Sequence, residues 1–147
     1  LLKSAVSPSH EADRERHQFT YAIYPHQGSW RQGGTVPMAY RLNVPLSAAV
    51  AQGRGCWPAA RSFVRLEGDN AVLEVVKRAE DADALILRLY ECHNRRGSVA
   101  LTLDRPVKRA RLCNLMEQPG ADLPVDGGRI TLPLSNYEIA TVMVELG

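Results

Sequence analysis

Apolar and polar residues alternate over several short stretches of the chain, and turn-forming residues separate these stretches. Residues 138–146 show the pattern most clearly, because every second position from Ala140 to Leu146 is apolar. Alternation of this kind predicts half-buried β-strands, whose successive side chains point to opposite faces. The predicted strands span residues 17–24, 62–66, 71–79, 85–90, 98–103, 109–116, 130–134 and 138–146.

One short segment predicts a helix instead. In residues 35–43, Thr35 can act as the N-terminal cap, Pro37 is tolerated in a first turn, and Pro45 follows the predicted end. Residues 48–58 contain two glycines and show no periodicity, so we expect a surface loop there. Many short strands, polar turns and at most one short helix predict an all-β fold, an antiparallel β-sandwich.

Length and composition predict one folded domain. At 147 residues, with 45% hydrophobic and 23% charged residues, the chain can bury a core and does not resemble a disordered protein. Residues 1–16 are polar and predict a linker or the end of a preceding strand, which leaves the sandwich to residues 17–147. The chain starts at Leu1, which suggests a piece of a longer polypeptide. Apolar runs are too short for a membrane span, so no membrane partner is expected.

Charge and cysteine usage exclude further classes. The net charge is +2, and the basic residues are scattered except for the cluster Lys108, Arg109 and Arg111 and the pair Arg95, Arg96. This distribution argues against a nucleic-acid partner. The cysteines Cys56, Cys92 and Cys113 are odd in number and lack metal-site spacing. They predict reduced thiols and therefore a cytoplasmic location.

Side chains that could carry chemistry are present but not grouped in the sequence. The 16 acidic residues offer no spacing that nominates a catalytic pair, and the acidic run at residues 80–83 is a solvated turn. None of the four histidines stands at metal-ligand spacing from another. We therefore predict no catalytic residue, no metal ligand and no cofactor within this chain.

Aromatic residues raise one alternative function. Tyr24, Trp30 and Trp57 lie in or beside predicted loops, where β-sandwich modules often place rings that stack on sugars. An autonomous carbohydrate-binding module is therefore the competing interpretation. Packing of Trp30 against the short helix in a core is the simpler expectation for that residue.

Five segments in order resemble a known family. The segments are HQFTYAIYPHQGSW (residues 17–30), AYRLNVPL (39–46), LILRLYECHNRRG (85–97), RLCNLMEQP (111–119) and ITLPLSNYEIATVMVEL (130–146). The whole set is similar to the C-terminal β region of glycoside hydrolase family 38, the α-mannosidases, and especially to its cytosolic and bacterial branch.

The resemblance implies a role within a larger enzyme. The parent would be a retaining exo-α-mannosidase that hydrolyses terminal α-mannosyl residues of oligosaccharides, with zinc or another divalent metal in an upstream domain. Because those metal and nucleophile motifs do not occur here, we expect this chain to be inactive and to support the upstream catalytic domain. Tyr24, His26 and Arg95 are the predicted contributors to the rim of the substrate cleft. Its expected partners are that catalytic domain and the oligosaccharide, and a homo-oligomer would also be compatible.

Overall fold

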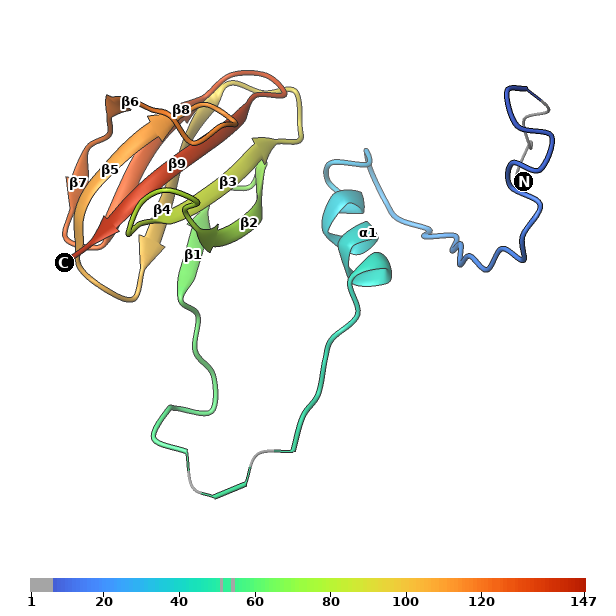
Figure 1. Cartoon of the computed structure of the whole chain (residues 1–147), viewed down its shortest axis with the longest axis horizontal. Helices are drawn as coiled ribbons and strands as arrows, with labels where there is room; N and C mark the ends of the chain where they lie inside the picture. The colour runs from blue at the N-terminus through green and yellow to red at the C-terminus, as the bar shows by residue number, and fades with distance from the viewer. Residues whose placement is uncertain (1–6, 51, 54) are drawn as a thin grey trace. The chain divides into compact units, whose positions relative to one another are not determined.

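Two antiparallel sheets contain the strands of the computed structural model, which describes residues 7–50, 52–53 and 55–147 (Figure 1). The four-stranded sheet has the order β1 (Val64–Glu67), β4 (Gly97–Leu103), β8 (Arg129–Leu134) and β7 (Val125–Asp126). The five-stranded sheet has the order β2 (Ala71–Arg78), β3 (Leu85–Glu91), β9 (Ile139–Leu146), β5 (Val107–Cys113) and β6 (Pro119–Asp122). The predicted all-β sandwich with one short helix, α1 (Thr35–Asn43), is confirmed.

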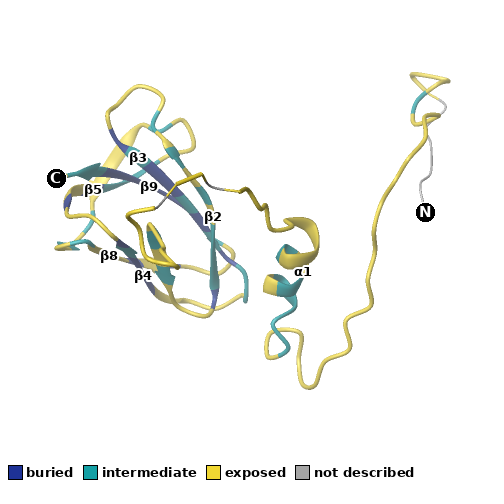
Figure 2. Cartoon of the chain, turned by 90° about the horizontal axis from the view of Figure 1, so that it is seen from below, coloured by how far each residue is buried: buried dark blue, intermediate teal, exposed yellow. Residues whose placement is uncertain are grey.

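The main core lies between the two sheets, and alternation along the strands supplies it. On β9, Ala140, Val142 and Val144 face inward, as the pattern predicted, and all three are buried. Figure 2 shows the buried positions concentrated in the central strands. The fully buried side chains of this core include Leu87, Leu89, Leu101, Ile130, Leu132, Val142 and Val144.

A second, smaller cluster lies on the outer face of the five-stranded sheet. Ile86 of β3 and Met143 of β9 are register partners there and are buried with Ala84. Long polar side chains lie over the same face: Arg88 donates to Thr141 Oγ1 at 3.0 Å, and Arg111 pairs with Glu145 at 2.8 Å. Such side chains cover apolar surface with their methylene stems while their charged ends stay near water.

The prediction of a strand at residues 17–24 is wrong for this structure. No strand is assigned to this segment, and Phe19, Tyr21 and Ile23 are 60%, 76% and 90% exposed. A strand is defined by backbone hydrogen bonds to a neighbouring strand. The alternation is therefore present in the sequence, but the described residues of its own unit contain no strand with which it could pair.

Three local predictions also need correction. Thr35 begins α1, but its buried hydroxyl has no hydrogen-bond partner and so does not cap the helix. The strand predicted for 109–116 ends at Cys113, because Asn114 Oδ1 accepts hydrogen bonds from the N–H groups of Met116 and Gln118 and closes a turn. The short strands β6 and β7 lie where only turns were expected.

The chain divides into two compact units, Leu1–Ala39 and Tyr40–Gly147. All strands of the described residues fall in the second unit. The predicted boundary between residues 16 and 17 stays a prediction, and residues 1–6 of the predicted linker lie outside the described residues. A helix with the length and apolar character needed to cross a bilayer does not occur among the described residues.

Substituting Gly128 by alanine is expected to lower the free energy of unfolding by about 1–3 kcal/mol, the usual range for overpacking. A Cβ at this position would lie 2.8 Å from the carbonyl oxygen of Leu103 and 3.0 Å from that of Arg105, so backbone would have to move. Urea unfolding measures the change. Gly55→Ala is the control, because a Cβ there meets nothing within 4 Å; equal effects of both substitutions would contradict the prediction.

Candidate functional site

Loops at one end of the sandwich converge on a buried carboxylate. Glu91 is the last residue of β3, and only 1% of its surface is exposed. Its Oε1 accepts a hydrogen bond from the His93 N–H at 2.8 Å, and its Oε2 accepts one from the Tyr137 N–H at 2.9 Å. One side chain therefore connects the turn after β3 to the turn before β9.

Asn70 adds a third loop to this cluster. Its side-chain amide donates to Glu91 Oε1 at 3.5 Å and to the backbone carbonyl oxygen of Arg95 at 3.2 Å. The backbone carbonyl oxygen of Asn70 accepts a hydrogen bond from the Cys92 N–H at 2.8 Å. Asn70 is itself buried. The turn before β2, the turn after β3 and the turn before β9 are consequently held as one body, which we call the Glu91 loop cluster (residues 68–70, 91–97 and 135–138).

The electrostatics of Glu91 indicate a structural anion. Burial alone would raise the pKa of this carboxyl, but hydrogen bonds from the backbone N–H groups of Tyr137 and His93 outweigh burial and hold the pKa below its usual value. A general acid of a glycosidase needs a raised pKa instead. Glu91 is therefore ionised near neutral pH and positions loops; it cannot deliver a proton.

Acid is expected to destabilise the sandwich through this group. A carboxyl whose pKa is lower in the folded than in the unfolded chain contributes stability that is fully present above the unfolded value, about 4.3 for Glu. That contribution is lost as the pH falls through the folded pKa. Urea unfolding between pH 7 and pH 3 should show decreasing stability, with a smaller decrease in Glu91→Gln; the same decrease in that variant would contradict the assignment.

The outer surface of the Glu91 loop cluster is polar and internally bonded. Arg95 pairs with Asp69, and Arg96 donates to Asn136 Oδ1 at 3.3 Å. The Asn136 amide in turn donates to Asn94 Oδ1 at 2.9 Å. These bonds place guanidinium and amide groups side by side on the surface. Both kinds of group carry several hydrogen-bond donors, with which they can bind the hydroxyl groups of a ligand.

Two of the three predicted rim residues lie together in the other unit. The rings of Tyr24 and His26 have centroids 5.7 Å apart, and the Tyr24 hydroxyl donates to the carbonyl oxygen of Gly33 at 3.0 Å. Arg95 belongs to the second unit. A shared role of the three residues at a substrate rim stays a prediction.

The tryptophans do not behave as core residues. Trp57 is 61% exposed and Trp30 is also exposed, so the expected core position of Trp30 is wrong. A guanidinium lies over each ring: Arg61 is 4.7 Å from the Trp57 centroid, and Arg31 is 4.6 Å from that of Trp30. Cation–π contacts of this kind occupy a ring face that a sugar would need.

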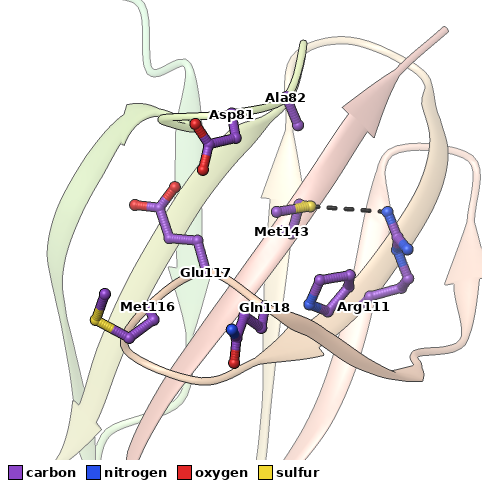
Figure 3. Close-up of a pocket in the computed structure, with 8 residues that line it drawn as sticks. Asp81, Ala82, Arg111, Met116, Glu117, Gln118 and Met143 are labelled. Carbon is purple, nitrogen blue, oxygen red and sulfur yellow. Dashed lines mark hydrogen bonds between the residues drawn. The ribbon is translucent and has the colours of Figure 1, made fainter.

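A small cavity on the outer face of the five-stranded sheet brings two acidic residues to one opening (Figure 3). It has a volume of about 260 Å³, and Asp81, Glu117 and Arg111 contribute to its walls. Glu117 accepts hydrogen bonds from Lys77 Nζ at 2.7 Å and from the Glu80 N–H at 2.8 Å, and these bonds lower its pKa. A glycosidase acid needs a raised pKa, so Glu117, paired with Lys77 and lowered in pKa, does not fit that role.

Asn70 and Glu91 were not identified from the sequence as the residues that hold the loops together. A signal for Glu91 existed, because it continues the inward positions Leu85, Leu87 and Leu89 by the same two-residue step. No comparable signal marks Asn70, which follows an exposed turn. Within the described residues, no group of three or more His, Cys, Asp or Glu side chains gathers in a way that could hold a metal ion.

The residues of the sandwich and of the Glu91 loop cluster are similar to those of known proteins. Residues 70–142 match the family model of the glycosyl hydrolases family 38 C-terminal beta sandwich domain. The chain is 36% identical to Alpha-mannosidase 2C1 of Mus musculus and 37% identical to Alpha-mannosidase 2C1 of Homo sapiens, over 99% of its own length. It is 27% identical to Alpha-mannosidase G of Dictyostelium discoideum over 96% of its length. The chain spans only 14% of the first two relatives and 13% of the third.

Proposed function

We propose that the chain, whose residues 70–142 match the glycosyl hydrolases family 38 C-terminal beta sandwich domain, belongs to that family and serves as the non-catalytic C-terminal domain of an α-mannosidase. The observation that carries this proposal is the similarity to α-mannosidases over 99% of the chain, which nevertheless amounts to 14% of those enzymes. The parent enzyme would release terminal α-mannosyl residues from oligosaccharides with retention of configuration.

The chemistry would reside outside these residues. A zinc or other divalent metal site needs three or four converging ligands, and the described residues do not fit that requirement. The carboxylates that the structure holds most firmly, Glu91 and Glu117, have lowered pKa values and fixed hydrogen-bond partners. No step of glycoside hydrolysis is therefore assigned to a residue of this chain.

The contribution of the domain would be a rigid surface beside the catalytic part. The Glu91 loop cluster fixes the backbone of Arg95 through Asn70, so its polar side chains start from a defined position. Tyr24, His26 and Arg95 remain the proposed residues at the rim of the substrate cleft. Guanidinium and imidazole groups can donate to mannose hydroxyls, and the Tyr24 ring offers an apolar face.

A reducing compartment is part of the proposal. Cys56, Cys92 and Cys113 are all free thiols, and burial raises the pKa of both Cys92 and Cys113. Thiols of raised pKa are weakly reactive and need no disulfide partner. This supports a cytoplasmic location for the enzyme.

The test is an activity assay of the separate chain and of the enzyme that contains it. With Zn²⁺ and an aryl α-mannoside, the 147-residue chain should give no turnover above buffer, whereas the longer enzyme should release the aryl alcohol. Zinc-dependent turnover by the 147-residue chain alone would place the reaction centre inside it and overturn the proposal.

The exposed Trp57 supports a second candidate, a carbohydrate-binding module that acts on its own. It predicts that mannose quenches or shifts tryptophan fluorescence of the 147-residue chain. We expect no change at millimolar mannose, because Arg61 lies over one face of the Trp57 ring and Phe63 packs against it edge-on at 5.5 Å. A saturable change that Trp57→Ala abolishes would favour the module instead.

A further inference from the structure

Residues 17–24 combine a strand sequence with an exposed, extended conformation. Apolar side chains at Phe19, Tyr21 and Ile23 alternate with Gln18, Thr20 and Ala22, yet every residue of the segment is exposed and outside the assigned strands. Aromatic and β-branched residues at every second position fit a pleated, half-buried surface. An isolated extended segment has no way to satisfy this pattern.

Local structure holds one end of the segment. Tyr24 donates to the Gly33 carbonyl, and the intervening turn is closed by hydrogen bonds from the Gly33 N–H to Ser29 at 2.9 Å and from the Thr35 N–H to Trp30 at 3.1 Å. Pro25 ends the alternating run. The segment thus emerges from a closed turn and needs only a partner for its backbone and its apolar face.

We propose that residues 17–24 form an added β-strand on a sheet edge that lies outside these 147 residues, in the remainder of the same α-mannosidase. The inference rests on the proposed function, which supplies that remainder. The partner must offer unpaired backbone N–H and C=O groups and an apolar surface on the side of Phe19, Tyr21 and Ile23. Its other side can be open to water, because Gln18 and Thr20 point there.

The comparisons favour this partner over a second copy of the chain. The alignment to the mouse and human relatives covers 99% of the chain, so it extends through the alternating segment, while 14% coverage leaves most of each relative available as a surface. Strand addition also explains why the segment keeps a strand pattern although the described residues of its own unit contain no strand. Main-chain bonds would give affinity, and the three apolar side chains would set the register.

Hydrogen–deuterium exchange with mass spectrometry tests the proposal on peptides that cover residues 17–24. In the 147-residue chain these amides should exchange within seconds, as unprotected amides do. In the longer enzyme, amides of alternate residues should exchange at least about 100-fold more slowly, as amides in stable strands do. Rapid exchange of the whole segment in the longer enzyme would overturn the proposal.

Two variants of the longer enzyme separate the faces of the strand. Tyr21→Glu puts a charge on the apolar face and should abolish the protection, whereas Thr20→Glu puts the same charge on the polar face and should preserve it. Loss of protection in both variants, or in neither, would contradict docking through one face. Protection already present in the 147-residue chain would also overturn the proposal, by placing the partner edge within this chain or in a second copy.

The outcomes distinguish this inference from the proposed function. If the longer enzyme hydrolyses an α-mannoside but residues 17–24 exchange freely, only the strand inference fails. If the segment is protected but the enzyme shows no α-mannosidase activity, the strand pairing stands and the proposed function fails.

Discussion

Replacing Glu91 by alanine is expected to lower the free energy of unfolding by about 3 kcal/mol, since each buried donor left without an acceptor costs about 1–3 kcal/mol. The substitution removes the acceptors of the His93 and Tyr137 N–H groups and one partner of the Asn70 amide. It also opens a void at a position that is only 1% exposed. Urea unfolding followed by far-ultraviolet circular dichroism measures the change.

Two further variants define what the alanine result means. Glu91→Gln keeps the size and one acceptor oxygen, so it should cost less than Glu91→Ala but still destabilise, because its NH₂ group faces a backbone donor. Glu67→Gln changes an exposed carboxyl that pairs with Arg129 at the surface, and it should leave the unfolding midpoint nearly unchanged. If Glu91→Ala were as mild as Glu67→Gln, the loops would not depend on the buried carboxylate.

The Glu91 loop cluster connects stability with the proposed function. The bonds to Glu91 hold the backbone at His93 and the turn at Tyr137, and the Asn70 amide holds the carbonyl oxygen of Arg95. Asn94 and Tyr137 both adopt positive φ angles, 56° and 53°, a conformation that non-glycine residues hold only where surrounding contacts impose it. A surface built this way can present polar groups to a ligand without a large loss of loop entropy.

The strands that face the main core were predictable because their sequences carry a period of two. Residues 85–90 and 138–146 were located to within one residue of β3 and β9. The short strands β6 and β7 were not, because they lie at the sheet edges, and backbone pairing with β5 and β8 defines them rather than side-chain burial. Pro119 and Gly120 suggest a turn from sequence alone, and only the neighbouring strand makes them part of a sheet.

The candidate site was predictable only in part. Arg95 was placed in the turn after β3 from its neighbours in sequence, but its connection to Asn70 spans 25 residues and depends on how β2 pairs with β3. Tyr24 and His26 do lie together, as neighbours two residues apart readily can. Residues 17–24 carry the pattern of a strand, but the identity of the pairing edge depends on residues elsewhere in the fold.

The outer face of the five-stranded sheet holds a small buried cluster of its own. Strand alternation predicts that the face opposite the core is solvated, and a solvated position tolerates truncation with little cost. Ile86 lies on that face but is 0% exposed, because it clusters with the buried Ala84 and Met143 and the partly buried Ala79 and Cys113 pack against them.

Ile86→Ala is therefore expected to lower the free energy of unfolding by about 3 kcal/mol, within the range for truncation of a buried isoleucine. Val76→Ala is the matched control on the neighbouring strand β2, because Val76 is 52% exposed and should lose only a few tenths of that amount. Urea unfolding of both variants gives the comparison. Equal, small losses in the two variants would mean that the outer cluster is not packed. A loss at Ile86→Ala comparable to that of Leu87→Ala would show that β3 is buried on both faces. The five-stranded sheet would then carry a second packed layer on its outer side.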